Sequence, residues 1–167
     1  ASSVHSLTVI VAFMPASQGV MHWPPEGPGL VGLVDEAELP LPDYAVDRVL
    51  LVHGLENSES LRGLLREIWR VLTGDGRLLV VVPNRRGIWA RSDRTPLGWG
   101  HPYSGNQLSR VLRDNMFIPT RTERALYVPP IANYTFLRSA PAWERMGARF
   151  FPTFSGVVMI ESGKQLY

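Results

Sequence analysis

The feature that most constrains the fold is a strand–helix–strand pattern in the middle of the chain. The run RVLLVHG after Asp47 predicts a buried strand, and RLLVVVP over residues 77–83 predicts another. Between them, residues 59–72 place leucine, isoleucine and valine at three-and-four spacing, which predicts a helix with one apolar face. We expect residues 57–58, Asn-Ser, to cap this helix and residues 74–76, Gly-Asp-Gly, to end it.

The alternation of strands and helices continues on both sides of this unit. At 167 residues, 45% of them hydrophobic, the chain is long enough for one domain with a buried core. Buried strands alternating with amphipathic helices predict an α/β domain with a mainly parallel sheet. In the last predicted helix Trp143, Met146 and Phe150 share one face. The other predicted strands cover residues 6–15, 30–34, 120–130 and 156–164, and the other predicted helices cover residues 104–115 and 143–151.

The composition limits the possible functions. The chain has no cysteine, which excludes disulfides and cysteine-bound metals, and its histidines follow no metal-ligand spacing, so no metal site is expected. A net charge of +2 does not by itself indicate nucleic acid. The first apolar run, residues 7–14, is too short to cross a membrane. Among the 17 basic residues only Lys164 is a lysine, a skew that favours a bacterial source, and we expect a soluble cytoplasmic protein.

The string from Gly27 to Gly32 spells G-x-G-x-x-G, the pattern of a phosphate-binding turn. That turn works only where a strand leads into it and a helix follows, because the helix amides bind the phosphate. Here Trp-Pro-Pro precedes the string, a predicted strand follows it, and Pro28 lacks an amide hydrogen. We therefore interpret the string as an ordinary loop.

An acidic segment from Asp35 to Pro40 follows the predicted strand over residues 30–34. A carboxylate at this place can accept a hydrogen bond from an exocyclic amine, the next amide can donate to a ring nitrogen, and Leu39 can pack on a ring face. These are the contacts that an adenine ring needs. Taken alone, however, the six residues are better explained as an acidic turn.

The order of motifs that continues from this segment resembles the class I S-adenosylmethionine-dependent methyltransferases, in particular their type 11 group. In that family an aspartate ends the third strand and Leu-Pro-Phe follows it. A second aspartate precedes the fourth strand, and the pattern EIxRVLxPGG leads into the fifth. The resemblance covers about residues 30–84, and its matching residues are Asp35, Leu39, Pro40, Asp47, Glu67, Ile68, Arg70, Val71, Leu72 and Gly76.

This resemblance implies S-adenosylmethionine as the cofactor and a place for it. Asp35 would meet the adenine amine, and the amide of Glu36 would meet a ring nitrogen. The segment after the fourth family strand would line the methionine end, whereas Glu67 and Arg70 would hold the helix in place. The implied cofactor-binding residues are Asp35, Glu36, Ala37, Leu39, His53, Gly54 and Leu55.

The chain departs from the family at its start. A strand and a glycine-rich turn should precede Ser6, yet only residues 1–5 stand there. Phe13-Met14-Pro15 occupies the place of the family's ribose-binding acid. We expect a Rossmann-like sheet, mainly parallel with an antiparallel C-terminal strand, that misses its usual first strand. Residues 1–167 would form a single incomplete domain that binds S-adenosylmethionine only with a further N-terminal portion; a natural truncation without cofactor is the alternative.

Residues 84–104 are rich in arginine and aromatic residues, and we interpret them, with residues 129–155, as insert or lid segments. Their arginines would bind an anionic group of the methyl acceptor. A surface loop that is anchored by its tryptophans is an equally good interpretation. The candidate substrate-binding residues are Arg85, Arg86, Trp89, His101 and Tyr103.

The implied function is methyl transfer from S-adenosylmethionine to a small molecule, or a degenerate relative of such an enzyme, with His53 or His101 as a candidate general base. Glu56 and Glu59 are interpreted as acids at the start of a helix. One alternative is a non-catalytic interaction module that forms a homo-oligomer. The other is an RNA-binding or RNA-modifying protein that uses residues 85–94, against which the small net charge argues. No membrane partner is expected.

Overall fold

The computed structural model describes residues 9–16, 19, 22–29, 31–91, 96–98, 100–128 and 139–166. The predicted α/β class is confirmed, because strands and helices alternate along these segments. The strands are β1 (Ala12–Pro15), β2 (Val31–Val34), β3 (Val46–Val52), β4 (Leu72–Pro83), β5 (Phe117–Ala125) and β6 (Val157–Lys164). The helices are α1 (Leu61–Val71), α2 (Gly105–Asp114) and α4 (Ala140–Phe150), with short 3-10 turns at Trp89–Arg91, Pro96–Gly98 and Pro152–Phe154.

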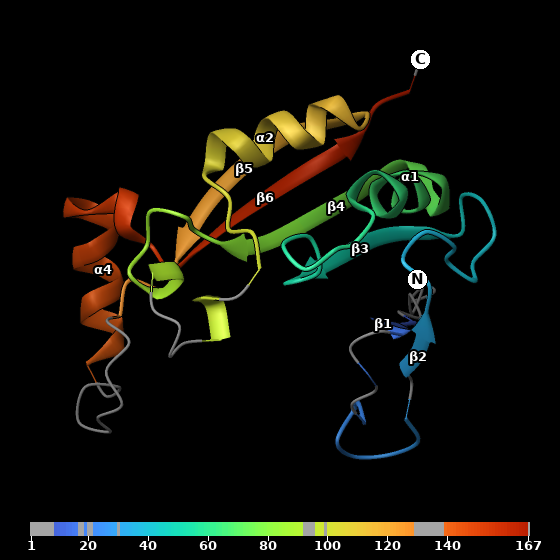
Figure 1. Ribbon diagram of the computed structural model, residues 1–167, viewed down its shortest axis with the longest axis horizontal. Coiled ribbons are helices and arrows are strands. Elements are labelled where there is room, and N and C mark those ends of the chain that lie inside the picture. Colours follow the sequence, from blue (N-terminus) through green and yellow to red (C-terminus); the bar gives the residue numbers. More distant parts are fainter. Residues whose placement is uncertain are drawn as a thin grey trace, which may run out of the picture.

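The strands form two separate sheets (Figure 1). Four of them pair in the order β3-β4-β6-β5, with β3 and β4 parallel and β6 antiparallel to both of its neighbours. β1 and β2 form a parallel pair of their own, which lies beyond the β3 edge of the larger sheet. The antiparallel C-terminal strand is therefore confirmed.

The hydrophobic core lies between one face of the larger sheet and two helices. Figure 1 shows α1 and α2 on the same side of this sheet. Buried leucine and valine side chains of β4 meet the apolar faces of both helices, as the three-and-four spacing predicts. The buried cluster consists of Leu55, Leu64, Leu65, Ile68, Leu72, Leu78, Val80, Val82, Leu108, Leu112, Phe117, Val158 and Ile160.

Two strands that the sequence predicted to be buried have exposed apolar residues. In β3, Leu50 is 63% exposed and Val52 is 50% exposed. Residues 9–11, just before β1, are more than half exposed. The reason is that, among the described residues, β1 and β3 each pair with one neighbour only, and the helices α1 and α2 pack on one face of the larger sheet, which leaves Leu50 and Val52 uncovered. The predicted strand over residues 6–15 begins at Ala12, and residues 6–8 lie outside the described part.

The ends of α1 differ from the prediction. The cap is Ser60, not residues 57–58, and its own side chain makes no capping bond. Instead Glu36, from the loop after β2, accepts a hydrogen bond from the Ser60 amide at 2.6 Å. The helix ends at Val71, and residues 74–76 belong to β4 instead of separating it from the helix. This part of β4 is irregular, since the register of its pairing with β3 shifts between Val46 and Arg48.

The C-terminal half matches the sequence more closely in α2 than in α4. Ser104 and Gln107 form a capping box at the start of α2, where the helix was predicted to begin. In α4 the predicted apolar face is not a core face, since Met146 is 52% exposed and Phe150 is 64% exposed. The buried residue of α4 is Gly147, where an added Cβ would lie 2.4 Å from the Tyr127 ring.

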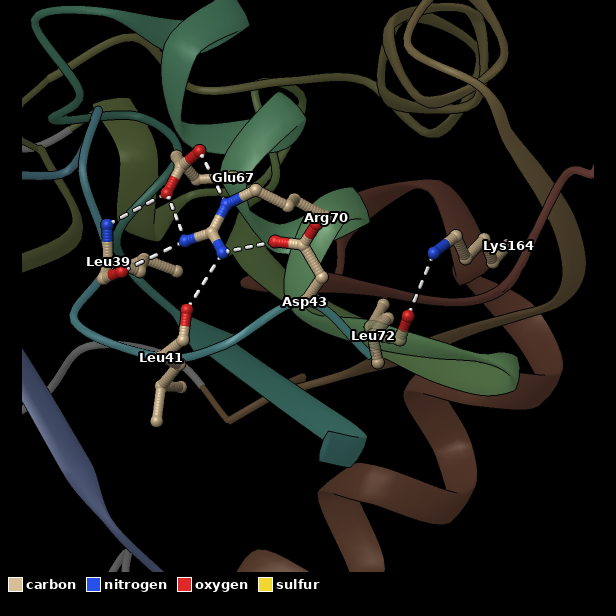
Figure 2. Close-up of polar contacts among 7 residues, drawn as sticks. All are labelled: Leu39, Leu41, Asp43, Glu67, Arg70, Leu72 and Lys164. Carbon is tan, nitrogen blue, oxygen red and sulfur yellow. Dashed lines mark hydrogen bonds and ion pairs between the residues drawn. The ribbon is translucent and has the colours of Figure 1, made fainter. Parts of the chain in front are cut away.

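The buried ammonium group of Lys164 ties the last strand to the first half of the chain. Its Nζ donates to the carbonyl of Leu72 at 2.8 Å (Figure 2). The same Nζ lies 4.0 Å and 3.9 Å from the ring centres of Tyr44 and Trp69. Burial lowers the pKa of Lys164. The two rings compensate the cost of burying the charge through cation–π contacts.

Candidate functional site

The loop after β2 carries the proposed adenine contacts. Asp35 follows the last residue of β2 and is exposed. Its Oδ1 accepts a hydrogen bond from the Ala37 amide at 2.9 Å, and its carbonyl accepts one from the Glu38 amide at 3.1 Å. The acidic turn that the sequence suggested is therefore present. It presents the Asp35 carboxylate to solvent at the carboxyl end of a parallel strand.

Helix α1 fixes the continuation of this loop through two charged side chains. Glu67 accepts a hydrogen bond from the Leu39 amide at 2.9 Å. Arg70 donates to the carbonyls of Leu39 and Leu41 at 2.9 Å and 2.8 Å and to Asp43 at 2.7 Å (Figure 2). Both peptide groups that flank Leu39 are thus bound by the helix.

Glu67 and Arg70 also bind each other through two hydrogen bonds, of 3.0 Å and 2.8 Å. The hydrogen bond from Arg70 holds the pKa of Glu67 below its ordinary value, and Glu67 in turn raises the pKa of Arg70. The sequence predicted a structural role for this pair. In the structure the pair fastens residues 35–43, which we call the candidate cofactor loop, to α1.

The loop also contacts the first turn of α1. A Cβ added at Gly63 would lie 3.1 Å from the Cβ of Ala37, so the glycine lets the loop approach the helix closely. Leu39 packs against the hydrophobic core and is half-buried. Of the predicted adenine-side residues, Asp35, Glu36, Ala37 and Leu39 are therefore together on one loop against one helix.

His53 stands directly after β3 in a backbone conformation that is uncommon for a residue with a side chain, with φ of 52°. Its Nδ1 lies 2.7 Å from Oε1 of Glu56. The Glu56 side chain is 2% exposed, whereas that of His53 is 37% exposed. The side-chain Nδ2 of Asn57 donates to the His53 carbonyl at 3.0 Å, which closes the turn.

Glu56 was predicted to be an acid at a helix start, and that interpretation is wrong. Helix α1 begins at Leu61, and the Glu56 carboxyl is buried beside His53 instead. Its second oxygen, Oε2, has no hydrogen-bond partner among the described residues. The sequence signal for this contact was the His-x-x-Glu spacing, which a tight turn can also bring together.

The two residues after His53 have different surroundings. Gly54 is half-buried, and an added Cβ would lie 2.5 Å from the Leu51 side chain. Leu55 is 2% exposed and its side chain belongs to the core. The Leu55 side chain is therefore not available to a ligand.

The segment after β4 is organised by Asn84. Its side-chain amide donates to the carbonyl and hydroxyl of Ser155 at 2.9 Å and 3.0 Å, and to the carbonyl of Thr153 at 3.0 Å. Its Oδ1 accepts from the amide of Arg86, and Arg85 donates its amide to the carbonyl of Tyr103. The two ends of residues 84–104 are thus joined beside β4, with the side chains of both arginines exposed.

The other residues predicted to bind the methyl acceptor differ in how exposed their side chains are. Trp89 donates its indole N–H to the carbonyl of Val128 at 2.7 Å, which anchors the segment. His101 is exposed, and its amide donates to the carbonyl of Glu56 at 3.0 Å. Tyr103 is half-buried, and its pKa is raised by burial and by the charge of Glu56. His101 and Tyr103 therefore meet the His53 turn through Glu56.

A shallow hollow of about 340 Å³ lies beside this cluster and is lined by residues including His101, Tyr103 and Arg110. Asp35 does not line it. Residues 92–95, 99 and 129–138, which belong to the predicted lid segments and to the arginine-rich run, lie outside the described residues.

The chemistry of the site fits one end of the implied cofactor better than the other. The exposed carboxylate of Asp35, the neighbouring backbone and Leu39 offer what an adenine ring needs. The end of β1 offers Phe13, Met14 and Pro15, which have no carboxylate for ribose hydroxyls. Within the described residues, no three potential metal ligands gather at one place. No helix in the same segments is long and apolar enough to span a membrane.

Comparison with known protein sequences supports the fold and the cofactor class. A family model described as a methyltransferase domain matches residues 24–80. Probable S-adenosylmethionine-dependent methyltransferases from two strains of Mycobacterium tuberculosis are 37% identical to the chain over 84 residues. The aligned part is 49% of this chain and 30% of each relative, so the chain spans under a third of those proteins.

Solved structures show the same fold. A putative methyltransferase from Haloferax volcanii, in complex with a methyltransferase activator, matches with a TM-score of 0.58 at 18% identity, over 82% of this chain and 61% of that chain. A Thermotoga maritima S-adenosylmethionine-dependent methyltransferase, described as a possible histamine N-methyltransferase, matches with a TM-score of 0.58 at 17% identity, over 82% and 65% of the two chains. The predicted methyltransferase-like fold is confirmed by these matches.

Proposed function

We propose that the chain is part of a class I S-adenosylmethionine-dependent methyltransferase, with S-adenosylmethionine as its cofactor, and that it takes part in methyl transfer to a small-molecule acceptor; the matched segment and the shared fold support this. The observation that carries this proposal is the loop from Asp35 to Asp43, which Glu67 and Arg70 fasten to α1 inside the matched segment. A loop held this firmly is preorganised for a ligand.

The proposed cofactor contacts follow the loop and the turn after β3. Asp35 accepts from the adenine amine, the Glu36 amide donates to the ring, and Leu39 packs on its face. The backbone of residues 53–55 lines the methionine end. When bound, the cofactor supplies the methyl group in an activated form, so the chain's own task is to bind, orient and move a proton.

We propose that a further strand, from a part of the protein outside these 167 residues, lies between β1 and β3. The support is the one-sided pairing of both strands and the exposed apolar residues beside them, Leu50, Val52 and residues 9–11. Unpaired strand edges favour the addition of another strand. Such a strand would join the two sheets and would place the adenine loop and the His53 turn on one continuous surface.

The acceptor is proposed to bind on the β4 side, between the segments of residues 84–104 and 139–155. The exposed side chains of Arg85, Arg86 and His101 support the binding of an anionic or polar group of the acceptor there. Tyr103 would form a wall beside them. Trp89 would not contact the acceptor directly; its hydrogen bond to Val128 would instead hold the segment in place.

Calorimetric titration of the full-length protein with S-adenosylmethionine and S-adenosylhomocysteine tests the proposal. We expect saturable binding of both, and a loss of about tenfold, or about 1.4 kcal/mol, in Asp35→Asn, because an amide cannot replace both acceptor oxygens. Asp75→Asn, in the irregular part of β4, is the matched control. The absence of heat with either ligand would overturn the cofactor proposal.

A second candidate function is a non-catalytic interaction module that covers its bare sheet edges with another copy of the chain. The exposed apolar residues near β1 and β3 and the missing ribose acid favour it. Sedimentation velocity separates the two candidates. A tight dimer that binds neither cofactor form supports the module, whereas a cofactor-binding monomer excludes it.

A further inference from the structure

Glu56 is a buried residue that is not a member of the hydrophobic core cluster, and its Oε1 lies 2.7 Å from Nδ1 of His53. A buried carboxyl group costs stability unless its oxygens are hydrogen-bonded, yet Oε2 of Glu56 has no hydrogen-bond partner in the part of the chain that the structure describes. His53 adds a left-handed backbone conformation, with φ of 52°. Two unfavourable features at the carboxyl end of one strand indicate a functional constraint, because strain of this kind gathers at active sites.

We propose that His53 is the general base of the methyl-transfer reaction and that Glu56 is the residue that positions it. This inference rests on the proposed function and narrows the acceptor class. The acceptor attacks through an O–H or N–H group that must lose its proton, such as a phenol, an alcohol or an amine. A thioether acceptor, which has no proton to lose, would need no such base.

The geometry determines which nitrogen of His53 can act. An ionised carboxylate only accepts hydrogen bonds, so the 2.7 Å contact places the imidazole proton on Nδ1. Nε2 then keeps its lone pair. Since the imidazole is 37% exposed while Glu56 is almost fully buried, Nε2 is the part of the pair that a small molecule can reach.

The surrounding groups hold this pair from two sides. Asn57 binds the His53 carbonyl, and the His101 amide binds the Glu56 carbonyl. Gly100, at φ of 82°, brings its segment so close that an added Cβ would lie 2.8 Å from the Glu56 carbonyl oxygen. The Glu56 charge also contributes to raising the pKa of Tyr103, after burial.

The proton and the charge balance within this arrangement. As the acceptor heteroatom forms its bond to the methyl carbon, its proton moves to Nε2 of His53, and the resulting imidazolium is stabilised by the Glu56 carboxylate. The cofactor supplies an electrophilic methyl group, and the electron pair of its broken bond stays on sulfur. Water then takes the proton from His53. His101, the other candidate base, contacts Glu56 through its backbone amide, so the structure favours His53.

The first test is spectroscopic and needs no acceptor. Nitrogen-15 NMR of the imidazole in the full-length protein should show neutral His53 protonated at Nδ1. Glu56→Leu, which removes the carboxylate at similar volume, should shift the proton to Nε2. Glu59→Gln, at an exposed position, is the control and should leave the spectrum unchanged. A wild-type His53 protonated at Nε2, or an unchanged tautomer in Glu56→Leu, would overturn the proposal.

The second test separates this proposal from the proposed function. Binding of S-adenosylhomocysteine should change less than twofold in Glu56→Leu, whereas Asp35→Asn weakens it. Methylation of a panel of phenols and amines by isotope-labelled S-adenosylmethionine should fall at least tenfold in kcat for Glu56→Leu and for His53→Gln. Equal rates in wild type and Glu56→Leu would refute the role of the pair, even if cofactor binding is normal.

Discussion

Replacing Glu67 by glutamine tests whether α1 holds the candidate cofactor loop through this carboxylate. Glu67 accepts from the Leu39 amide at 2.9 Å and from two nitrogens of Arg70. A glutamine has one acceptor oxygen and an NH₂ group that donates. If the glutamine oxygen takes the place of Oε2, Nε of Arg70 faces another donor. If it takes the place of Oε1, the Leu39 amide and Nη2 of Arg70 face another donor.

In either arrangement at least one half-buried donor loses its partner, which costs about 1–3 kcal/mol. We therefore expect Glu67→Gln to lower the free energy of unfolding by about 2 kcal/mol, or the melting temperature by about 4–8 °C in a chain of this size. Thermal and urea unfolding, followed by circular dichroism, measure the change. Glu59→Gln, an exposed control, should stay within about 0.5 kcal/mol of wild type.

The pH dependence of the free energy of unfolding gives an independent check of the role of Glu67. The pKa of Glu67 is lowered from 4.5 in the folded chain, so its stabilising effect is complete above that pH and is lost as the pH falls through the lowered value. The difference between wild type and Glu67→Gln should therefore shrink below about pH 4. A difference that is absent at pH 7, or one that is unchanged at pH 3, would refute the role given to this carboxylate.

Three further changes test other parts of the structure. Ser104→Ala removes the capping box with Gln107 and should lower stability by about 1 kcal/mol in urea unfolding. Lys164→Met keeps the length of the side chain but leaves the Leu72 carbonyl without its donor, so a loss of about 1–3 kcal/mol is expected; an unchanged midpoint would contradict it. Gly147→Ala places a Cβ against the Tyr127 ring and should lower the melting temperature, whereas alanine at the open position Gly19 should matter only through its backbone conformation.

The sequence predicts well those features that depend on neighbours in the chain. Ser104 and Gln107 are three residues apart, so their capping box is visible as a pattern. The start of α1 was misplaced because the carboxylate that binds its Ser60 amide comes from Glu36, on a distant loop. A prediction from local spacing cannot include a contact between residues that are 24 positions apart in the chain.

Burial was predicted less well, for a related reason. The run around Leu50 and Val52 is as apolar as that of β4, but only one face of β3 meets the helices. For the candidate site, the position of Asp35 after a strand could be predicted from the resemblance. Glu56 could not be assigned, since its burial beside His53 depends on a turn that begins in the left-handed region.

The order of strands has a consequence for synthesis on the ribosome. β6 lies between β4 and β5, so β5, which is made earlier, has no place in the sheet until the last residues of β6 emerge. The contact of Lys164 with Leu72 spans 92 positions of the chain and closes at the same late stage. The larger sheet can therefore be completed only after β6 has been translated, although β3 and β4 can pair earlier. Until then the faces of α2 and β5 that pack on β6 lack their partner, which makes this segment slow to complete its fold.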